Sequence, residues 1–264
     1  MIKALSRTSV DLKTTEVISS LLQILNTKKA RYNDKVETLE KEYARLIGVK
    51  EAVAFPYSRT GTYYALMALE LQEGDEVIMP AFTFWVDAAM VVMAGLKPVF
   101  VDVNFETQSI DTALIENAIT PRTKVIYPTH LNGLPADMDQ IMKIAKKHDL
   151  RVMEDCARSC GATYNDKRIG SFDIGSFSFG YGKSFYGFGG AMVTSDNTAF
   201  IKKLRDLKKD FKHISLKNLC IQTLKGSLLK YLNISYFYRF SIFPMVYKFQ
   251  VEGKEQYAGR FRVK

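Results

Sequence analysis

Residues 76–103 read EVIMPAFTFWVDAAMVVMAGLKPVFVDV, and this stretch decides the fold class. It predicts a short buried strand over Glu76–Met79, which the following proline ends because proline cannot donate to a sheet ladder. A helix is predicted over Thr83–Met93, and Gly95 ends it before a second strand over Pro98–Val103. Short apolar strands that alternate with helices are typical of an α/β fold with a largely parallel sheet.

The same alternation continues on both sides of this stretch. Further helices are predicted over Glu16–Leu25, Lys35–Leu46, Thr62–Leu71, Asp111–Ala118 and Met138–His148, and further strands over Ala52–Phe55, Thr123–Pro128, Arg151–Glu154, Asp173–Phe179 and Ala191–Thr194. Ligands of parallel α/β sheets bind at the carboxyl ends of the strands. The segments that follow Phe55, Glu154 and Phe179 are therefore the places where site residues are expected.

The composition is that of a globular protein. The chain has 264 residues, of which 47% are hydrophobic and 25% charged, so it can bury a sizeable core and is neither disordered nor a coiled coil. Its three cysteines are too few for a disulfide scaffold and indicate a reducing compartment, and no metal site is expected. Because residues 1–13 lack an apolar leader and no uncharged run reaches 18 residues, we expect a cytoplasmic protein without an ordinary transmembrane helix.

The segment after Phe55 carries hydroxyl groups directly before a predicted helix. It reads Tyr-Ser-Arg-Thr-Gly-Thr over residues 57–62. The free N–H groups and the dipole of a helix N-terminus favour an anion such as a phosphate. The plainer alternative is a simple helix N-cap.

The other two segments add an acid and a lysine. Asp155 leaves a buried strand, where its carboxylate would pair with a protonated ring nitrogen or else form a structural ion pair. Lys183 follows Phe179 among glycines and aromatic residues, where lost solvation would make its amine nucleophilic, although a surface lysine in a turn is the plainer alternative. A phosphate cradle, a ring-nitrogen acid and a Schiff-base lysine together indicate a site for pyridoxal 5′-phosphate (PLP), whose ring draws electrons only while its nitrogen stays protonated.

Several further stretches carry a family resemblance. They are GDEVI at 74–78, PAFTF at 80–84, GLKPVFVD at 95–102, ITPRTK at 119–124, HLNGLPADMD at 130–139, Glu154-Asp155, GATY at 161–164, and FSF at 177–179 with Lys183. As a set they resemble the DegT–StrS family of PLP-dependent sugar aminotransferases, over about residues 10–210. The resemblance implies the large domain of a type I PLP transferase, in which helices flank a mostly parallel sheet.

The resemblance also implies roles for single residues. Lys183 would bind PLP covalently and shuttle the proton between the substrate α-carbon and the cofactor. Asp155 would hold the pyridinium nitrogen, Phe84 would stack on the ring, and Ser178 would bind the phosphate.

The phosphate-binding turn and Arg158 are the two positions of the PLP site where the match to the family is not direct. The phosphate-binding turn of the family falls on Ser58 and Arg59 when the chain is aligned without a gap from Gly74, whereas the similar run Thr60–Thr62 needs an insertion. Arg158 stands where the family usually has a glutamine near the phenolic oxygen of PLP. Its guanidinium would either favour the phenolate more strongly or bind an anionic part of the substrate.

The resemblance stops near residue 210, so we expect a PLP-binding large domain over 1–210 and a separate segment over 211–264. The resemblance implies that relatives continue into a small domain that closes over the substrate, and neither that domain nor their Asn-containing segment is recognised here. The chain is then a fragment, or residues 211–264 form an atypical or truncated helical segment.

The C-terminal part is strongly basic. Residues 197–264 hold 15 lysines and arginines against four acids, whereas the preceding residues carry a net charge of −2. Eight aromatic residues lie within 228–249, between Lys230, Arg239 and Lys248. Such a segment suits peripheral contact with the inner face of a membrane, while the alternative is a buried helix pair or a dimer contact. No nucleic-acid partner is expected, since no recognised binding motif accompanies the bases.

The sequence therefore predicts a PLP-dependent aminotransferase that converts a keto-sugar to an amino sugar with an amino acid donor, and the resemblance implies that the sugar is nucleotide-linked. Such a reaction would serve polysaccharide, lipopolysaccharide or secondary-metabolite biosynthesis, and the family implies a homodimer. The alternative is a catalytically impaired or regulatory relative with the same fold. A sugar dehydratase of the same family is a weaker third reading, because such relatives replace the lysine that this chain keeps as Lys183.

Overall fold

The computed structural model describes residues 34–209, Phe211 and 216–232, together with residues 14, 15, 18, 19 and 22. These residues fall into two compact units. One unit comprises Arg31–His213, and the other includes the helix α8 (Leu216–Leu232). Most of the predicted helix over Glu16–Leu25 and most of the segment 228–249 lie outside the described residues.

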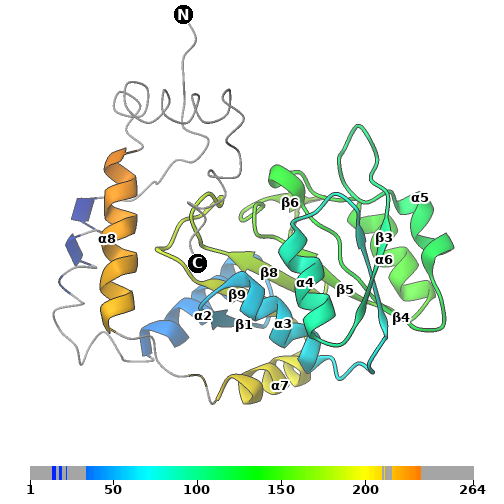
Figure 1. Ribbon diagram of the computed structural model, residues 1–264, viewed down its shortest axis with the longest axis horizontal. Coiled ribbons are helices and arrows are strands. Elements are labelled where there is room, and N and C mark those ends of the chain that lie inside the picture. Colours follow the sequence, from blue (N-terminus) through cyan, green and yellow to red (C-terminus); the bar gives the residue numbers. More distant parts are fainter. Residues whose placement is uncertain are drawn as a thin grey trace, which may run out of the picture. The chain divides into compact units, whose positions relative to one another are not determined.

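A seven-stranded sheet organises the larger unit (Figure 1). In chain order its strands are β1 (Glu51–Phe55), β2 (Glu76–Pro80), β3 (Lys97–Val101), β4 (Thr123–Ile126), β5 (Arg151–Asp155), β8 (Ile174–Ser178) and β9 (Ala191–Ser195). Their order in the sheet is β1-β9-β8-β5-β4-β2-β3. All neighbours are parallel except that β9 runs antiparallel to both β1 and β8. The predicted mostly parallel α/β sheet is thus confirmed.

Helices cover both faces of the sheet (Figure 1). They are α2 (Asp34–Ile47), α3 (Ser58–Ala68), α4 (Trp85–Met93), α5 (Thr112–Ile115), α6 (Met138–Lys147) and α7 (Thr198–Lys208). Along β2, Val77 packs in one core cluster with residues of α3, α4 and α7, while Ile78 packs in a second cluster with residues of α2 and α6. Successive side chains of a strand point to opposite faces, so an inner strand covered on both sides needs an unbroken apolar run.

Both predicted ends of one helix are wrong. The helix expected over Thr62–Leu71 is α3, which begins at Ser58 and ends at Ala68. Residues 58–62, expected as a turn, therefore form the first turn of this helix. The helix ends early because Glu70 has a φ of +55°, which lies outside the right-handed helical region.

A small hairpin not predicted from the sequence follows β5. It pairs β6 (Thr163–Tyr164) with β7 (Lys167–Arg168). Asn165 and Asp166 form its two-residue turn with φ values of +47° and +62°. Asparagine and aspartate tolerate this left-handed region, so the Asn-Asp pair was a usable signal for the hairpin. Among the residues described, no helix is both long enough and apolar enough to cross a membrane.

Candidate active site

The sheet topology brings the three predicted segments to one edge. Since β9 is antiparallel to both β1 and β8, these two strands run in the same direction, and β5 is parallel to β8. The carboxyl ends of β1, β5 and β8 therefore lie on the same side of the sheet. The start of α3, the residues after Asp155 and the glycine-rich segment 180–190 all follow directly from these ends.

Lys183 lies in the glycine-rich segment and faces an aromatic ring. Its Nζ is 5.7 Å from the centroid of the Phe84 ring, which is 47% exposed at the start of α4. The segment folds back on β8, because Phe179 donates to the carbonyl of Gly190 and accepts from the N–H groups of Gly187 and Gly189. Burial lowers the pKa of Lys183, which makes a neutral, nucleophilic amine more accessible.

Asp155 ends β5 as a buried carboxyl group, with only 7% of the residue exposed. Its Oδ1 accepts a hydrogen bond from the Ala157 N–H at 3.0 Å, and no other described group donates to this carboxyl. Burial raises the pKa of Asp155, and the positive charge of Lys183 opposes that rise. A buried acid with unused acceptor capacity beside a lysine fits a cationic N–H group such as that of a pyridinium ring.

The predicted phosphate residues lie at the same edge. Ser58 is the first residue of α3, and no acidic residue occupies the first turn of that helix, so its free N–H groups face no competing anion. The Arg59 guanidinium lies 4.4 Å from the centroid of the Tyr57 ring. Ser178 ends β8 as a buried residue, and its Oγ accepts from the Gly180 N–H at 3.5 Å. The structure places these residues at the same edge of the sheet, and their phosphate role stays a prediction.

The similar run Thr60–Thr62 offers less to a phosphate. Thr62 is fully buried, and its hydroxyl is 3.3 Å from the Tyr127 hydroxyl and 3.1 Å from the Ser176 hydroxyl. A threonine whose hydroxyl is engaged inside the core has none left for a ligand. The gap-free assignment to Ser58 and Arg59 is therefore the one that the geometry favours.

Arg158, which follows Asp155 by three residues, is exposed. Within the described part of the chain it has no hydrogen-bond or ion-pair partner, yet its positive charge lowers the pKa of Lys183. An unpaired guanidinium near the lysine suits either of the two predicted roles, toward the cofactor or toward a substrate anion.

The sequence analysis missed two residues of this neighbourhood, Asp87 on α4 and Tyr127 after β4. Both are buried, and the Tyr127 hydroxyl donates to Asp87 Oδ1 at 3.3 Å. The charges of Asp155 and Lys183 both act on Asp87, which places it beside the predicted site. A usable signal was present, since Asp87 is the sole charged residue of the apolar helix WVDAAMVVM.

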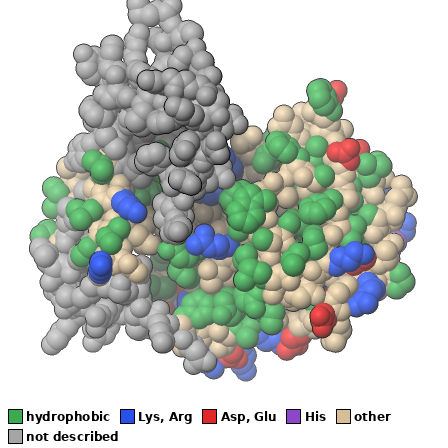
Figure 2. All heavy atoms as spheres, viewed as in Figure 1, with side chains coloured by type: hydrophobic (Ala, Val, Ile, Leu, Met, Phe, Trp, Pro, Cys, Tyr) green, Lys and Arg blue, Asp and Glu red, His purple; other side chains and the backbone are tan. Residues whose placement is uncertain are grey.

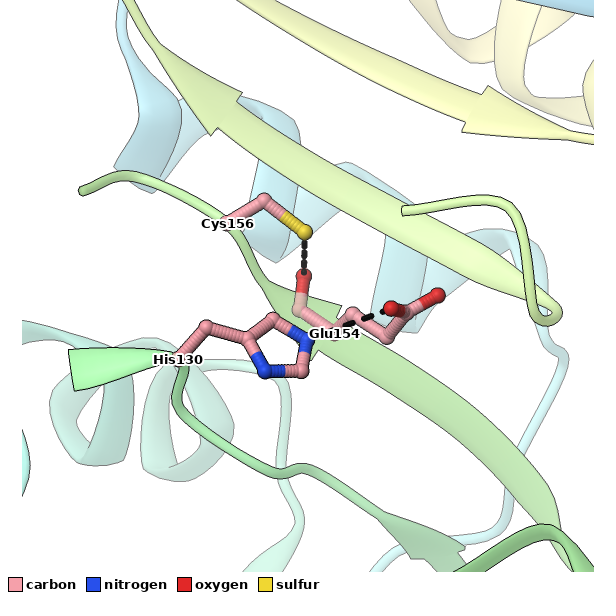
Figure 3. A group of neighbouring side chains, drawn as sticks. All are labelled: His130, Glu154 and Cys156. Carbon is pink, nitrogen blue, oxygen red and sulfur yellow. Dashed lines mark hydrogen bonds and ion pairs between the residues drawn. The ribbon is translucent and has the colours of Figure 1, made fainter. Parts of the chain in front are cut away.

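His130, Glu154 and Cys156 form a buried cluster whose ligand atoms lie within 4.8 Å of one another (Figure 3). Their hydrogen bonds already engage these atoms. His130 Nδ1 accepts from the Ala136 N–H at 3.0 Å, which leaves its Nε2–H to donate to Glu154 Oε2 at 3.2 Å. Figure 3 also shows the Cys156 thiol directed at the Glu154 carbonyl, at 3.6 Å.

Glu154 therefore serves the structure rather than the ligand site. Its carboxylate also accepts from the N–H groups of Gly170 and Phe172, at 2.8 and 2.9 Å. The cluster thus fastens two loops to β5 and presents no free ligand set for a metal. Adjacent residues of a strand point to opposite faces, so the Glu154 and Asp155 side chains lie in different surroundings.

Comparison with known proteins agrees with this geometry. The sequence model of the DegT/DnrJ/EryC1/StrS aminotransferase family matches residues 12–219, so the chain belongs to this family. A relative from Acidithiobacillus ferrooxidans, named UDP-N-acetyl-3-dehydro-α-D-glucosamine 3-aminotransferase, is 45% identical over 196 residues, which are 73% of this chain and 53% of the relative. The chain spans about half the length of the curated relatives that it matches.

Solved structures show the same fold. NtdA from Bacillus subtilis, solved with its bound cofactor PMP, has a TM-score of 0.72 at 30% identity and covers 89% of this chain and 57% of its own. DesI, solved with its TDP-sugar product, has a TM-score of 0.70 at 30% identity and covers 78% of this chain and 53% of its own. The family and these neighbours indicate pyridoxal phosphate as the cofactor, which the buried Asp155 and the ring-facing Lys183 fit.

Proposed function

We propose that this protein is a PLP-dependent aminotransferase that converts a nucleotide-linked keto-sugar to an amino sugar, with an amino acid as the donor. The observation that carries the proposal is the position of the Lys183 amine, 5.7 Å from the Phe84 ring and within the electrostatic influence of buried Asp155. The names of the relatives support a sugar substrate. When bound, PLP supplies the carrier for the amino group and the electron sink.

Each residue of this edge has a definite task in such a reaction. Asp155 would accept a hydrogen bond from the ring N–H, and the Phe84 ring would stack on the cofactor. Ser58, Arg59 and Ser178 would hold the phosphate together with the N-terminus of α3. Lys183 Nζ would move the proton at the substrate α-carbon, and its burial favours the neutral base needed for that step.

The whole chain, supplied with PLP, should transfer an amino group between glutamate and a UDP-linked 3-keto sugar. Amino sugar and 2-oxoglutarate should form in equal amounts, because each transfer moves one amine and leaves one oxo acid. Mass spectrometry of the sugar nucleotide and a 2-oxoglutarate assay measure the two products. Dehydrated sugar without 2-oxoglutarate would identify a dehydratase instead, and no product with any keto-sugar nucleotide tested would contradict the proposed activity.

We also propose a homodimer whose contact includes the surface near α4. Large apolar side chains are exposed there, namely Phe82, Trp85 and Met93, at 55%, 67% and 66%. Figure 2 shows hydrophobic side chains grouped on this face, over the region where α4 lies in Figure 1. A contiguous exposed apolar surface is typical of a protein interface.

Peripheral membrane contact is a separate proposal for the segment 228–249, of which residues 228–232 end α8. The described part of α8 exposes Ile221, Leu224 and Leu228, which lie on one helix face, with Lys217 and Lys225 also exposed. An apolar stripe beside basic residues suits the interface of an anionic bilayer.

Deleting residues 228–249 should weaken co-flotation with anionic liposomes by about 10²-fold. The deletion removes Lys230, Arg239 and Lys248, each worth about 1 kcal/mol at an anionic surface. Liposomes without anionic lipid serve as the control for the charge effect. Equal flotation of the full and the shortened chain would contradict membrane contact through this segment.

A further inference from the structure

Asp87 is a buried acid that the proposed reaction does not use. Only 5% of it is exposed, and within the described residues the single hydrogen-bond partner of its carboxyl group is the Tyr127 hydroxyl. Tyr127 in turn lies 3.3 Å from the Thr62 hydroxyl, which is 3.1 Å from that of Ser176. This chain of hydroxyl groups links α4, β4, α3 and β8, and no described cation hydrogen-bonds to the acid at its end.

Asp87 shares its surroundings with a second buried acid. The titratable groups whose charges act on Asp87 are Asp155, Tyr127 and Lys183. Those that act on Asp155 include Lys183 and His130. Two buried carboxyl groups therefore face one lysine, and that single cation cannot balance two neighbouring anions in a site of low dielectric.

The hydrogen bonds to the two acids show which carboxyl group is better stabilised as an anion. Asp155 accepts a backbone N–H at 3.0 Å and is opposed by the positive charge of Lys183. Asp87 accepts only from a tyrosine hydroxyl, at 3.3 Å. Burial, and then the negative charge of Asp155, raise the pKa of Asp87 well above its usual range.

We propose that Asp87 and Asp155 hold one proton between them at neutral pH, and that Asp87 carries it as an uncharged carboxylic acid. Asp155 is then left as the sole anion for the ring nitrogen. Asp87 acts as a positioning residue, which offers hydrogen bonds to the site without adding a second negative charge. Its role beside the cofactor rests on the proposed PLP function, while its protonation does not.

Infrared spectroscopy of the cofactor-free protein tests the protonation directly. At neutral pH the spectrum should contain the C=O band of a protonated carboxylic acid, and labelling with ¹³C-carboxyl aspartate should shift that band. Asp87→Asn should abolish it, whereas Asp155→Asn should keep it. The control Asp75→Asn alters another buried aspartate, one that accepts a backbone N–H at 2.8 Å, and should also keep the band.

Three outcomes would overturn the assignment: no such band in the parent protein, a band insensitive to aspartate labelling, or a band lost in Asp155→Asn and kept in Asp87→Asn. If Asp87→Asn does not fold, Tyr127→Phe replaces it. Loss of the hydroxyl donor should then shift the band without removing it, and an unmoved band would count against Asp87 as its source.

A second measurement tests the role at the site. In the PLP-loaded protein, ionisation of Asp87 at basic pH should change the visible absorbance of the cofactor, and Asp87→Asn should lack that step. If the absorbance titrations of the parent and the Asp87→Asn protein superimpose, Asp87 is a structural acid only. If PLP does not bind at all, the proposed function fails, while the infrared result still decides the protonation.

Discussion

Replacing Lys183 with alanine is expected to abolish covalent capture of PLP and to slow amino transfer by about 10²–10⁴-fold, the usual contribution of a positioned acid–base group. The physical reason is that the chain offers one amine placed against the Phe84 ring and beside the two buried acids of the site. No other lysine has both features within the described residues.

The measurement combines borohydride reduction with peptide mass spectrometry. In the unaltered protein, reduction should fix PLP on the peptide that contains Lys183, and the visible absorbance should change accordingly. Lys167→Ala is the matched control. Lys167 Nζ also lies over an aromatic ring, 4.3 Å from the Phe172 centroid, but its charge is not among those that act on Asp155. Unimpaired transfer by Lys183→Ala, or capture of PLP at another lysine, would remove the central claim about this site.

The sequence was sufficient for the large-domain fold because its signals are local. In the stretch 76–103, an apolar strand, a helix ended by Gly95 and a second strand follow one another, and the structure has β2, α4 and β3 there. The loops after β1, β5 and β8 could likewise be located in advance, since ligand sites of such sheets lie at strand ends.

What the sequence could not supply is set by contacts between distant residues. The start of α3 at Ser58 depends on packing of its first turn against the sheet, where Gly61 approaches Val193 of β9 too closely for a larger residue to fit without adjustment. Asp87 on α4 and Tyr127 after β4 meet only through a hydrogen bond between distant residues, and no short motif joins them. Glu154 and Asp155 are adjacent in sequence, yet only the hydrogen bonds show that Glu154 holds two loops while the Asp155 carboxyl accepts a single backbone N–H.

The electrostatic balance around Lys183 also emerges only in three dimensions. Burial lowers its pKa, Asp155 raises it, Arg158 lowers it and Asp87 raises it, in that order of importance. These residues come from three separate parts of the chain, so no single motif shows their combined effect. The lowered pKa of Lys183 favours the neutral amine that the proposed nucleophile and base roles require.

Asp155→Asn is expected to have opposite effects on cofactor binding and on stability. Affinity for PLP should fall by about 10–100-fold, because a charge-assisted hydrogen bond to the ring nitrogen is worth about 1.5–3 kcal/mol. Amino transfer should fall further, since an unprotonated ring is a poor electron sink. Equilibrium binding of PLP and the rate of 2-oxoglutarate formation are the two measurements.

The sign of the stability effect follows from the raised pKa of Asp155. A carboxyl group whose pKa is higher in the folded than in the unfolded chain makes folding less favourable as pH rises through that interval. At neutral pH the cofactor-free Asp155→Asn protein should therefore unfold with a free energy equal to that of the parent, or higher by on the order of 1 kcal/mol. The asparagine oxygen can still accept from the Ala157 N–H, so the local fold has no reason to change.

Asp173→Asn is the matched control for this pair of effects. Asp173 pairs with Arg151 through two bonds of 2.6 and 2.8 Å and accepts from the Val152 N–H, all at the end of β5 remote from the site. Its replacement should lower stability and leave PLP affinity unchanged, the reverse of the Asp155 pattern. If Asp155→Asn instead destabilised the cofactor-free protein and bound PLP normally, Asp155 would be an ordinary structural carboxylate and the ring-nitrogen assignment would be wrong.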